Sequence, residues 1–197
     1  MLVRRALMGH EVVIVVSGLP RSGTSMMMQM LEAGGMEVLT DRVRESDEDN
    51  PRGYFEMEAV KGLSKDQSCL DGAEGKSVKV ISELLKHLPS KYRYRVLFML
   101  RDMDEIISSQ NTMLVRRGKP TGNADDRKLS QFFQRHLERV MVWMEQQPNI
   151  DVLYVNYNEI LKDPNEGVGR ICRFLQSTLN PERMAGVVDK TLHRQRR

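Results

Sequence analysis

Apolar residues along the chain gather in short, continuous runs that alternate with longer stretches of helical periodicity. A continuous run of β-branched and apolar residues is typical of a strand buried on both faces of a parallel sheet. Five runs are predicted to be strands, at residues 11–17, 36–40, 77–82, 95–100 and 151–157. Strands that alternate with helices favour an α/β domain with a mostly parallel central sheet.

The stretches between these runs carry apolar residues at helical spacing. Helices are predicted at residues 22–33, 55–65, 103–117, 126–147 and 165–176. Three aspartates, Asp102, Asp126 and Asp163, stand where a helix N-cap would be useful. We predict a single domain over residues 1–197, a length that can bury a sizeable core.

Residues 41–54 form the longest stretch without a predicted helix or strand. Their mixed charge fits either a binding loop or a solvated surface. We favour the binding loop, because the stretch follows the second predicted strand at the edge where ligands bind in open α/β sheets.

The segment Gly18-Leu-Pro-Arg-Ser-Gly-Thr-Ser25 follows the first predicted strand and opens a helix. Its first and last glycines have the spacing of a P-loop, in which backbone N–H groups and a helix N-terminus form an anion cradle. The alternative is a tight strand-to-helix turn without a ligand. We predict a phosphate site within a P-loop NTPase-like three-layer sandwich of about five strands.

The loop departs from the nucleoside triphosphate-hydrolysing pattern at one position. Those enzymes place a lysine directly after the second glycine, where it reaches the β- and γ-phosphates. Here that position is Thr24, and the cation of the loop is Arg21. The loop therefore predicts an anion site without the hallmark lysine of ATP and GTP hydrolysis.

The run from Pro20 to Ser25 resembles the 5′-phosphosulfate loop of the sulfotransferases, which use 3′-phosphoadenosine 5′-phosphosulfate (PAPS) as sulfuryl donor. The resemblance implies that the donor is bound by five residues: Arg21, Ser22, Gly23, Thr24 and Ser25. It also requires a second signature, a strand ending in arginine with serine eight residues later, to grip the 3′-phosphate. Arg101 and Ser109 have this spacing, although Met103 replaces the proline that the family usually has two residues after the arginine. A guanidinium can fork onto a phosphate with two hydrogen bonds.

A third part of the chain, residues 152–164, resembles the family's late strand, tyrosine-containing turn and Asp-Pro pair. The resemblance implies that Tyr157 lies near the adenine, and packing at a strand end is the alternative. The three matches together extend over residues 12–175, which is nearly the whole chain.

Two cations are predicted to act on the sulfuryl group and the leaving phosphate. Arg21 lies in the loop itself. Lys79 lies between two valines of a predicted buried strand, where an unpaired ammonium would be costly, and a family lysine at this place reaches the leaving group. We therefore predict that Lys79 points to an anion or emerges at the end of its strand.

The general base is less clearly marked than the cations. Cytosolic small-molecule sulfotransferases carry a histidine two residues after the lysine, and here Ile81 stands at that position. Other branches of the family use glutamate. Glu56, in a stretch resembling one of bacterial relatives, and Asp41, at the end of the second predicted strand, are the candidates. The alternative for Glu56 is a carboxylate that favours the start of a helix.

Charge and composition narrow the possible partners. Thirty Lys plus Arg against 27 Asp plus Glu leave a net charge of +3, which argues against a nucleic-acid binder working by bulk charge. Two cysteines and four scattered histidines suggest neither a disulfide framework nor a metal site. No apolar run approaches the ~20 residues that cross a bilayer, and the N-terminus does not resemble an export signal, so we expect a cytoplasmic protein.

These observations predict a PAPS-dependent sulfotransferase that transfers a sulfuryl group to a hydroxyl or amine of a small-molecule, glycan or peptide acceptor, without a metal. An ATP-dependent P-loop kinase is one alternative, and the missing lysine after Gly23 argues against it. A catalytically inactive binder of 3′-phosphoadenosine nucleotides is the other, since no histidine base is present at Ile81. The basic tail at residues 194–197 either folds over the nucleotide or is a frayed terminus.

Overall fold

The structure is a computed structural model, and it describes residues 12–41, 43, 53–116, 118 and 123–189, with the side chains of residues 123–125 excepted. Five parallel strands form one sheet in the order β2-β3-β1-β4-β5. The strands are β1 (Val12–Gly18), β2 (Val38–Leu39), β3 (Ser77–Lys79), β4 (Arg93–Leu100) and β5 (Ile150–Asn156). The predicted α/β class with a parallel five-stranded sheet is confirmed.

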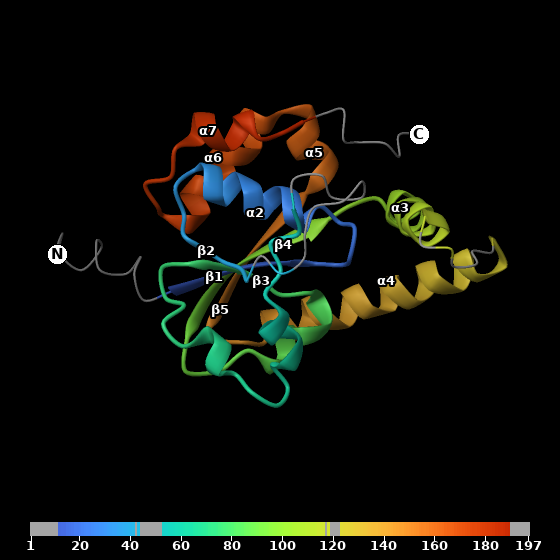
Figure 1. The fold of residues 1–197 in the computed structure, drawn as a ribbon, viewed down its shortest axis with the longest axis horizontal. Helices are drawn as coiled ribbons and strands as arrows, with labels where there is room; N and C mark the ends of the chain where they lie inside the picture. Colours follow the sequence, from blue (N-terminus) through green and yellow to red (C-terminus); the bar gives the residue numbers. More distant parts are fainter. Residues whose placement is uncertain (1–11, 42, 44–52, 117, 119–122, 190–197) are drawn as a thin grey trace.

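Helices and short 3₁₀ turns cover the two faces of this sheet (Figure 1). One face carries α2 (Thr24–Ala33), α5 (Tyr157–Lys162), α6 (Pro164–Leu175) and α7 (Pro181–Gly186). The other carries the 3₁₀ helices η1 (Glu58–Gly62), η2 (Ser68–Leu70) and η3 (Ser82–His87) and one end of α4 (Asn123–Glu145). The remaining helix, α3 (Met103–Arg116), lies beside the sheet and contacts α4.

Side chains of β1 alternate between two cores, one on each face of the sheet. Ile14 and Val16 belong to a core that includes the fully buried Met27, Met28 and Met30 of α2. Val13 and Val15, which alternate with them along β1, belong to the core on the other face, together with Tyr94 and Phe98 of β4. Because both faces are covered, a continuous run of apolar residues is what this central strand requires.

Parts of the predicted secondary structure are wrong in detail. The helix predicted at residues 55–65 is a 3₁₀ turn, Glu58–Gly62, preceded by extended chain in which Phe55 has a φ of 51°. A left-handed residue at this point breaks the helical path, although the apolar spacing suggested a helix. The strand predicted at residues 36–40 has only two residues, Val38–Leu39.

Two of the three predicted helix caps are confirmed, and one is wrong. The carboxylate of Asp102 accepts hydrogen bonds from the N–H groups of Asp104 and Glu105, and that of Asp163 accepts from Glu166, so both caps are confirmed. The prediction for Asp126 is wrong, because α4 begins at Asn123. Within the described residues, no helix combines the length and apolar character needed to cross a bilayer.

Candidate functional site

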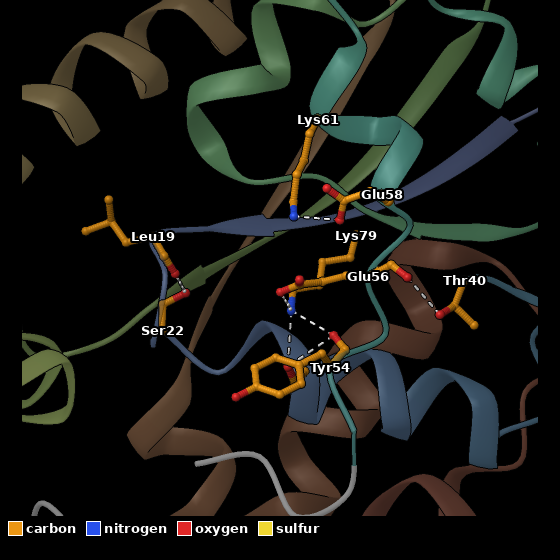
Figure 2. Close-up of polar contacts among 9 residues, drawn as sticks. Leu19, Ser22, Thr40, Tyr54, Glu56, Glu58, Lys61 and Lys79 are labelled. Atoms are coloured by element: carbon orange, nitrogen blue, oxygen red, sulfur yellow. Dashed lines mark hydrogen bonds and ion pairs between the residues drawn. The ribbon is translucent and has the colours of Figure 1, made fainter. Parts of the chain in front are cut away.

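The phosphate loop connects β1 to α2 at the carboxyl edge of the sheet. Gly18 and Gly23 have φ values of 145° and 100°, which L side chains rarely adopt. The loop is closed by Ser22, whose N–H and hydroxyl both donate to the carbonyl of Leu19, at 3.2 and 2.7 Å (Figure 2). No side chain caps the N-terminus of α2 at Gly23, so the first-turn amides are presented to an anion.

Arg21 joins the loop to α3 and β4. Its Nε donates to Oγ of Ser109 at 2.9 Å, and its own carbonyl accepts from Nη1 of Arg101 at 3.1 Å. Three residues that are predicted to bind the nucleotide, from three separate elements, thus form one hydrogen-bonded cluster. Arg21 also has a φ of 71°, an uncommon conformation for a residue with a side chain.

The guanidinium of Arg101 is held from several sides. Its Nε donates to Oε2 of Glu105 at 2.8 Å, and both side chains are at most 9% exposed. The other oxygen of Glu105 accepts from Nδ2 of Asn158 at 2.9 Å. The guanidinium carbon lies 4.4 Å from the ring centroid of Tyr157, a cation–π distance. These contacts fix the orientation of the guanidinium beside the phosphate loop.

Tyr157 packs directly against the phosphate loop. A Cβ atom on Gly23 would lie only 2.4 Å from Cδ2 of Tyr157, so the glycine is required by this contact as well as by its φ. Burial raises the pKa of the Tyr157 phenol, with Arg101 acting in the opposite direction. The structure therefore shows the packing role of Tyr157, and contact with adenine stays a prediction.

Lys79 ends β3 beside the start of α2, on the other side of the loop from Arg101. Its Nζ donates to the carbonyl of Tyr54 at 2.8 Å and to Oγ of Ser25 at 3.1 Å, and it lies 3.4 Å from Oε1 of Glu56 (Figure 2). The lysine side chain is 8% exposed. Lys79 was predicted to point to an anion or to emerge at the end of its strand, and it does both, because it is the last residue of β3 and its ammonium lies beside the Glu56 carboxylate.

The two candidate bases have different surroundings. The Glu56 carboxylate is 26% exposed and stands beside Lys79, while the Glu56 backbone carbonyl accepts from the hydroxyl of Thr40 at 2.9 Å. The Asp41 carboxylate instead accepts from the N–H groups of Glu58 and Val43, and these hydrogen bonds lower the pKa of Asp41. Hydrogen bonds that stabilise the charged form make a weaker base, which counts against Asp41.

Glu105 and Asn158 were not identified from the sequence. Glu105 stands four residues after Arg101, at the spacing of an ion pair on a helix, and this signal could have identified it. Asn158 has no comparable signal, because its contact with Glu105 spans 53 residues. The basic tail at residues 194–197 and most of the loop at 41–54 lie outside the described residues. In the part of the chain that is described, no three His, Cys, Asp or Glu side chains converge to hold a metal ion.

Comparisons with known proteins show the fold and the family of this chain. Two solved structures share the fold: the sulfotransferase domain from the curacin biosynthetic pathway, and sulfotransferase STF9 from Mycobacterium avium. The first has a TM-score of 0.53 and 13% identity over 91% of this chain and 88% of that one. The second has a TM-score of 0.56 and 15% identity over 90% of this chain and 67% of that one. A search of curated protein sequences finds no match. The model of the sulfotransferase domain family matches residues 12–196, and the chain therefore belongs to the sulfotransferase domain family.

Proposed function

We propose that this protein transfers a sulfuryl group from PAPS to a hydroxyl or amine acceptor. The observation that carries the proposal is the partly buried, hydrogen-bonded cluster of Arg21, Arg101 and Ser109 beside the uncapped start of α2. A 3′-phosphate needs a fixed guanidinium and a hydroxyl donor, and a 5′-phosphosulfate needs backbone amides at a helix N-terminus. This chain supplies both groups on opposite sides of one loop.

Lys79 and Arg21 are proposed to stabilise the transferring group and the leaving phosphate. Charge grows on the bridging oxygen as the bond to sulfur breaks, and a preorganised ammonium lowers the cost of that charge. Lys79 is held near the start of α2 by the Ser25 hydroxyl and the Tyr54 carbonyl. The position therefore requires no rearrangement during the reaction.

Glu56 is proposed to accept the proton of the attacking hydroxyl or amine. Its carboxylate is partly exposed and adjacent to Lys79, so an acceptor that reaches the sulfuryl group from solvent also reaches this carboxylate. Thr40 and Asp41 hold the backbone of Glu56 through its carbonyl, at 2.9 and 3.3 Å. In this proposal Asp41 positions the base rather than serving as the base.

A direct test is calorimetric binding of adenosine 3′,5′-bisphosphate, AMP and ATP with magnesium to the wild type and to Arg101→Ala. We expect the bisphosphate to bind most tightly and to lose roughly 30- to 100-fold in affinity in the variant, since a charge-assisted pair contributes about 2–3 kcal/mol. Arg93→Ala removes an exposed arginine at the start of the same strand and serves as the matched control.

Tight, magnesium-dependent ATP binding with weak bisphosphate binding would instead establish the kinase alternative. Incubation with PAPS and a panel of phenols, amines, sugars and peptides then separates an enzyme from an inactive binder. Formation of a sulfated product establishes the enzyme, and binding without turnover across the panel favours the binder.

A further inference from the structure

A buried histidine of α4 is hydrogen-bonded to the segment that follows Lys79. Nε2 of His136 lies 2.8 Å from Oγ of Ser82, a contact that spans 54 residues. The two residues are 8% and 3% exposed. This is a polar contact between α4 and the end of the β3 segment, in a region where α4 packs against η3.

The surroundings of His136 determine which atom donates in this hydrogen bond. Its other ring nitrogen, Nδ1, lies 3.4 Å from Oε2 of Glu83. Burial lowers the pKa of His136, so the neutral ring has a single N–H, and the nearby carboxylate favours placing that proton on Nδ1. Nε2 is then the acceptor, and the hydroxyl of Ser82 donates to it.

Ser82 lies three residues after Lys79, between the fully buried Val80 and Leu85. β3 contains only three residues, and the N–H of Val80 donates to the carbonyl of Val16 at 3.0 Å as its last bond to β1. η3 begins at Ser82 with no side-chain cap at Ile81. The bond to His136 therefore adds a polar restraint just after the last backbone hydrogen bond from this segment to β1.

Lys79 and Ser82 are anchored from opposite sides of the sheet. The ammonium of Lys79 contacts Ser25 on α2, whereas Val78 and Val80, its neighbours in β3, pack in the core that α4 helps to cover. An apolar pair at the position of His136 and Ser82 would avoid the cost of burying polar groups. A satisfied polar pair costs more to bury but specifies one arrangement, because any shift leaves both groups unpaired.

We propose that His136 is a positioning residue for Lys79: through Ser82 it fixes residues 80–82 and so holds the Lys79 ammonium at the phosphate loop. The importance of this position for catalysis rests on the proposed function. The positioning itself is a property of the free protein and can be measured without nucleotide or acceptor.

The test is trace acetylation of lysines with isotopically labelled acetic anhydride, read by mass spectrometry of peptides. Four proteins are compared: wild type, Ser82→Ala, His136→Phe and His136→Gln. Loss of one hydrogen bond corresponds to about a fivefold effect, so we expect Lys79 to react about fivefold faster in the alanine and phenylalanine variants. His136→Gln retains an acceptor for the Ser82 hydroxyl and should react at close to the wild-type rate.

Two other lysines provide the internal control for folding. Lys76 pairs with Glu37 at 2.8 Å and Lys91 with Asp71 at 2.7 Å, both away from Ser82, and their rates should not change. An unchanged Lys79 rate in Ser82→Ala overturns the proposal, and so does an equal rise at all three lysines in that variant. If His136→Phe fails to fold, Ser82→Ala alone decides, because it removes only one oxygen atom. Since no ligand enters the measurement, its failure leaves the proposed function standing, and failure of nucleotide binding leaves this result valid.

Discussion

The two sides of the phosphate loop are built in different ways. On the side of Arg101, the polar groups come from a strand end and the helices that follow the strands. Glu105 accepts from the Arg101 guanidinium and also from Asn158. On the side of Lys79, a single short strand contributes the lysine, and its partners Tyr54 and Glu56 lie in extended chain before η1. Regular elements hold the side that we propose binds the nucleotide, whereas the Lys79 side, proposed to face the acceptor, depends on an irregular segment together with Ser25 of α2.

This difference matches two tasks within one reaction. The same nucleotide serves every turnover, so a rigid site costs nothing in versatility. Acceptors differ between members of a fold, and sites for them are commonly built on loops carried by a rigid scaffold. The contrast predicts that substitutions at Arg101 change binding, whereas substitutions at Lys79 change rate.

The largest expected effect is that of Lys79→Met on the acceptor side. We expect the rate of sulfuryl transfer from PAPS to fall by about 10²- to 10³-fold, since a preorganised charge at the reacting centre is removed. Affinity for adenosine 3′,5′-bisphosphate should fall by a smaller factor than the rate, because Arg101 and Ser109 are untouched. Product formation and calorimetry measure the two quantities, and equal losses in both would contradict the division between the two sides.

Gly23→Ala is expected to show how tightly the nucleotide side is packed. A methyl group there meets the Tyr157 ring at 2.4 Å and also requires a φ of 100°, so we expect about 2–4 kcal/mol of lost stability. Gly35→Ala is the matched control, because Gly35 has a φ of 98° with no atom within 4 Å of its Cβ position. Urea denaturation should show a smaller loss for Gly35→Ala, and equal losses would mean that the Tyr157 contact contributes nothing.

Arg101→Lys is expected to have an intermediate effect on binding. The variant keeps the positive charge but lacks the fork that serves Glu105 and the Arg21 carbonyl together and that we propose binds a phosphate. We expect adenosine 3′,5′-bisphosphate to bind about tenfold more weakly by calorimetry, a cost of about 1.4 kcal/mol. Binding equal to that of the wild type would show that charge alone is sufficient there.

The smallest expected effect concerns the pH dependence of stability at His136. Burial lowers its pKa in the folded protein, with Arg139 and Lys86 acting in the same direction and Glu83 opposing them. The unfolded chain therefore binds more protons as the pH falls below about 6.5, and this contribution to stability is lost on acidification.

Denaturation of the wild type and His136→Gln at several pH values tests whether this contribution to stability is lost on acidification. The stability advantage of the wild type should be full above about pH 6.5 and should shrink at lower pH. His87→Gln, which replaces a partly exposed histidine of η3, provides the matched control. A stability difference between the wild type and His136→Gln that grows on acidification would contradict this prediction.

The sequence was most informative where chemistry and local structure coincide. The loop from Gly18 to Ser25 had to follow a buried strand and open a helix, and the structure has that arrangement. Arg101 and Ser109 were paired because their spacing matches the family's second signature, and the structure brings both to Arg21. Parallel strands place their carboxyl ends at one edge, so residues at strand ends were expected to meet.

Contacts between irregular segments could not be predicted in this way. The choice between Glu56 and Asp41 depends on which carboxylate the backbone of residues 43 and 58 captures, and no spacing rule determines that. The bond between Ser82 and His136 joins positions whose separation carries no periodic signal. The sequence also left two roles open for Tyr157, contact with adenine and packing at a strand end. The structure shows the packing, against Gly23.

The strand order has a consequence for how the chain is made. β1 is synthesised first, yet its hydrogen-bonded neighbours in the sheet are β3 and β4, whose residues emerge from the ribosome much later. Until Arg93–Leu100 has been translated, the apolar strand Val12–Gly18 lacks one of its partners. A sheet dominated by such distant parallel pairings folds slowly and exposes its strands meanwhile. The strand that carries the phosphate loop is therefore the part of the nascent chain most in need of protection from aggregation.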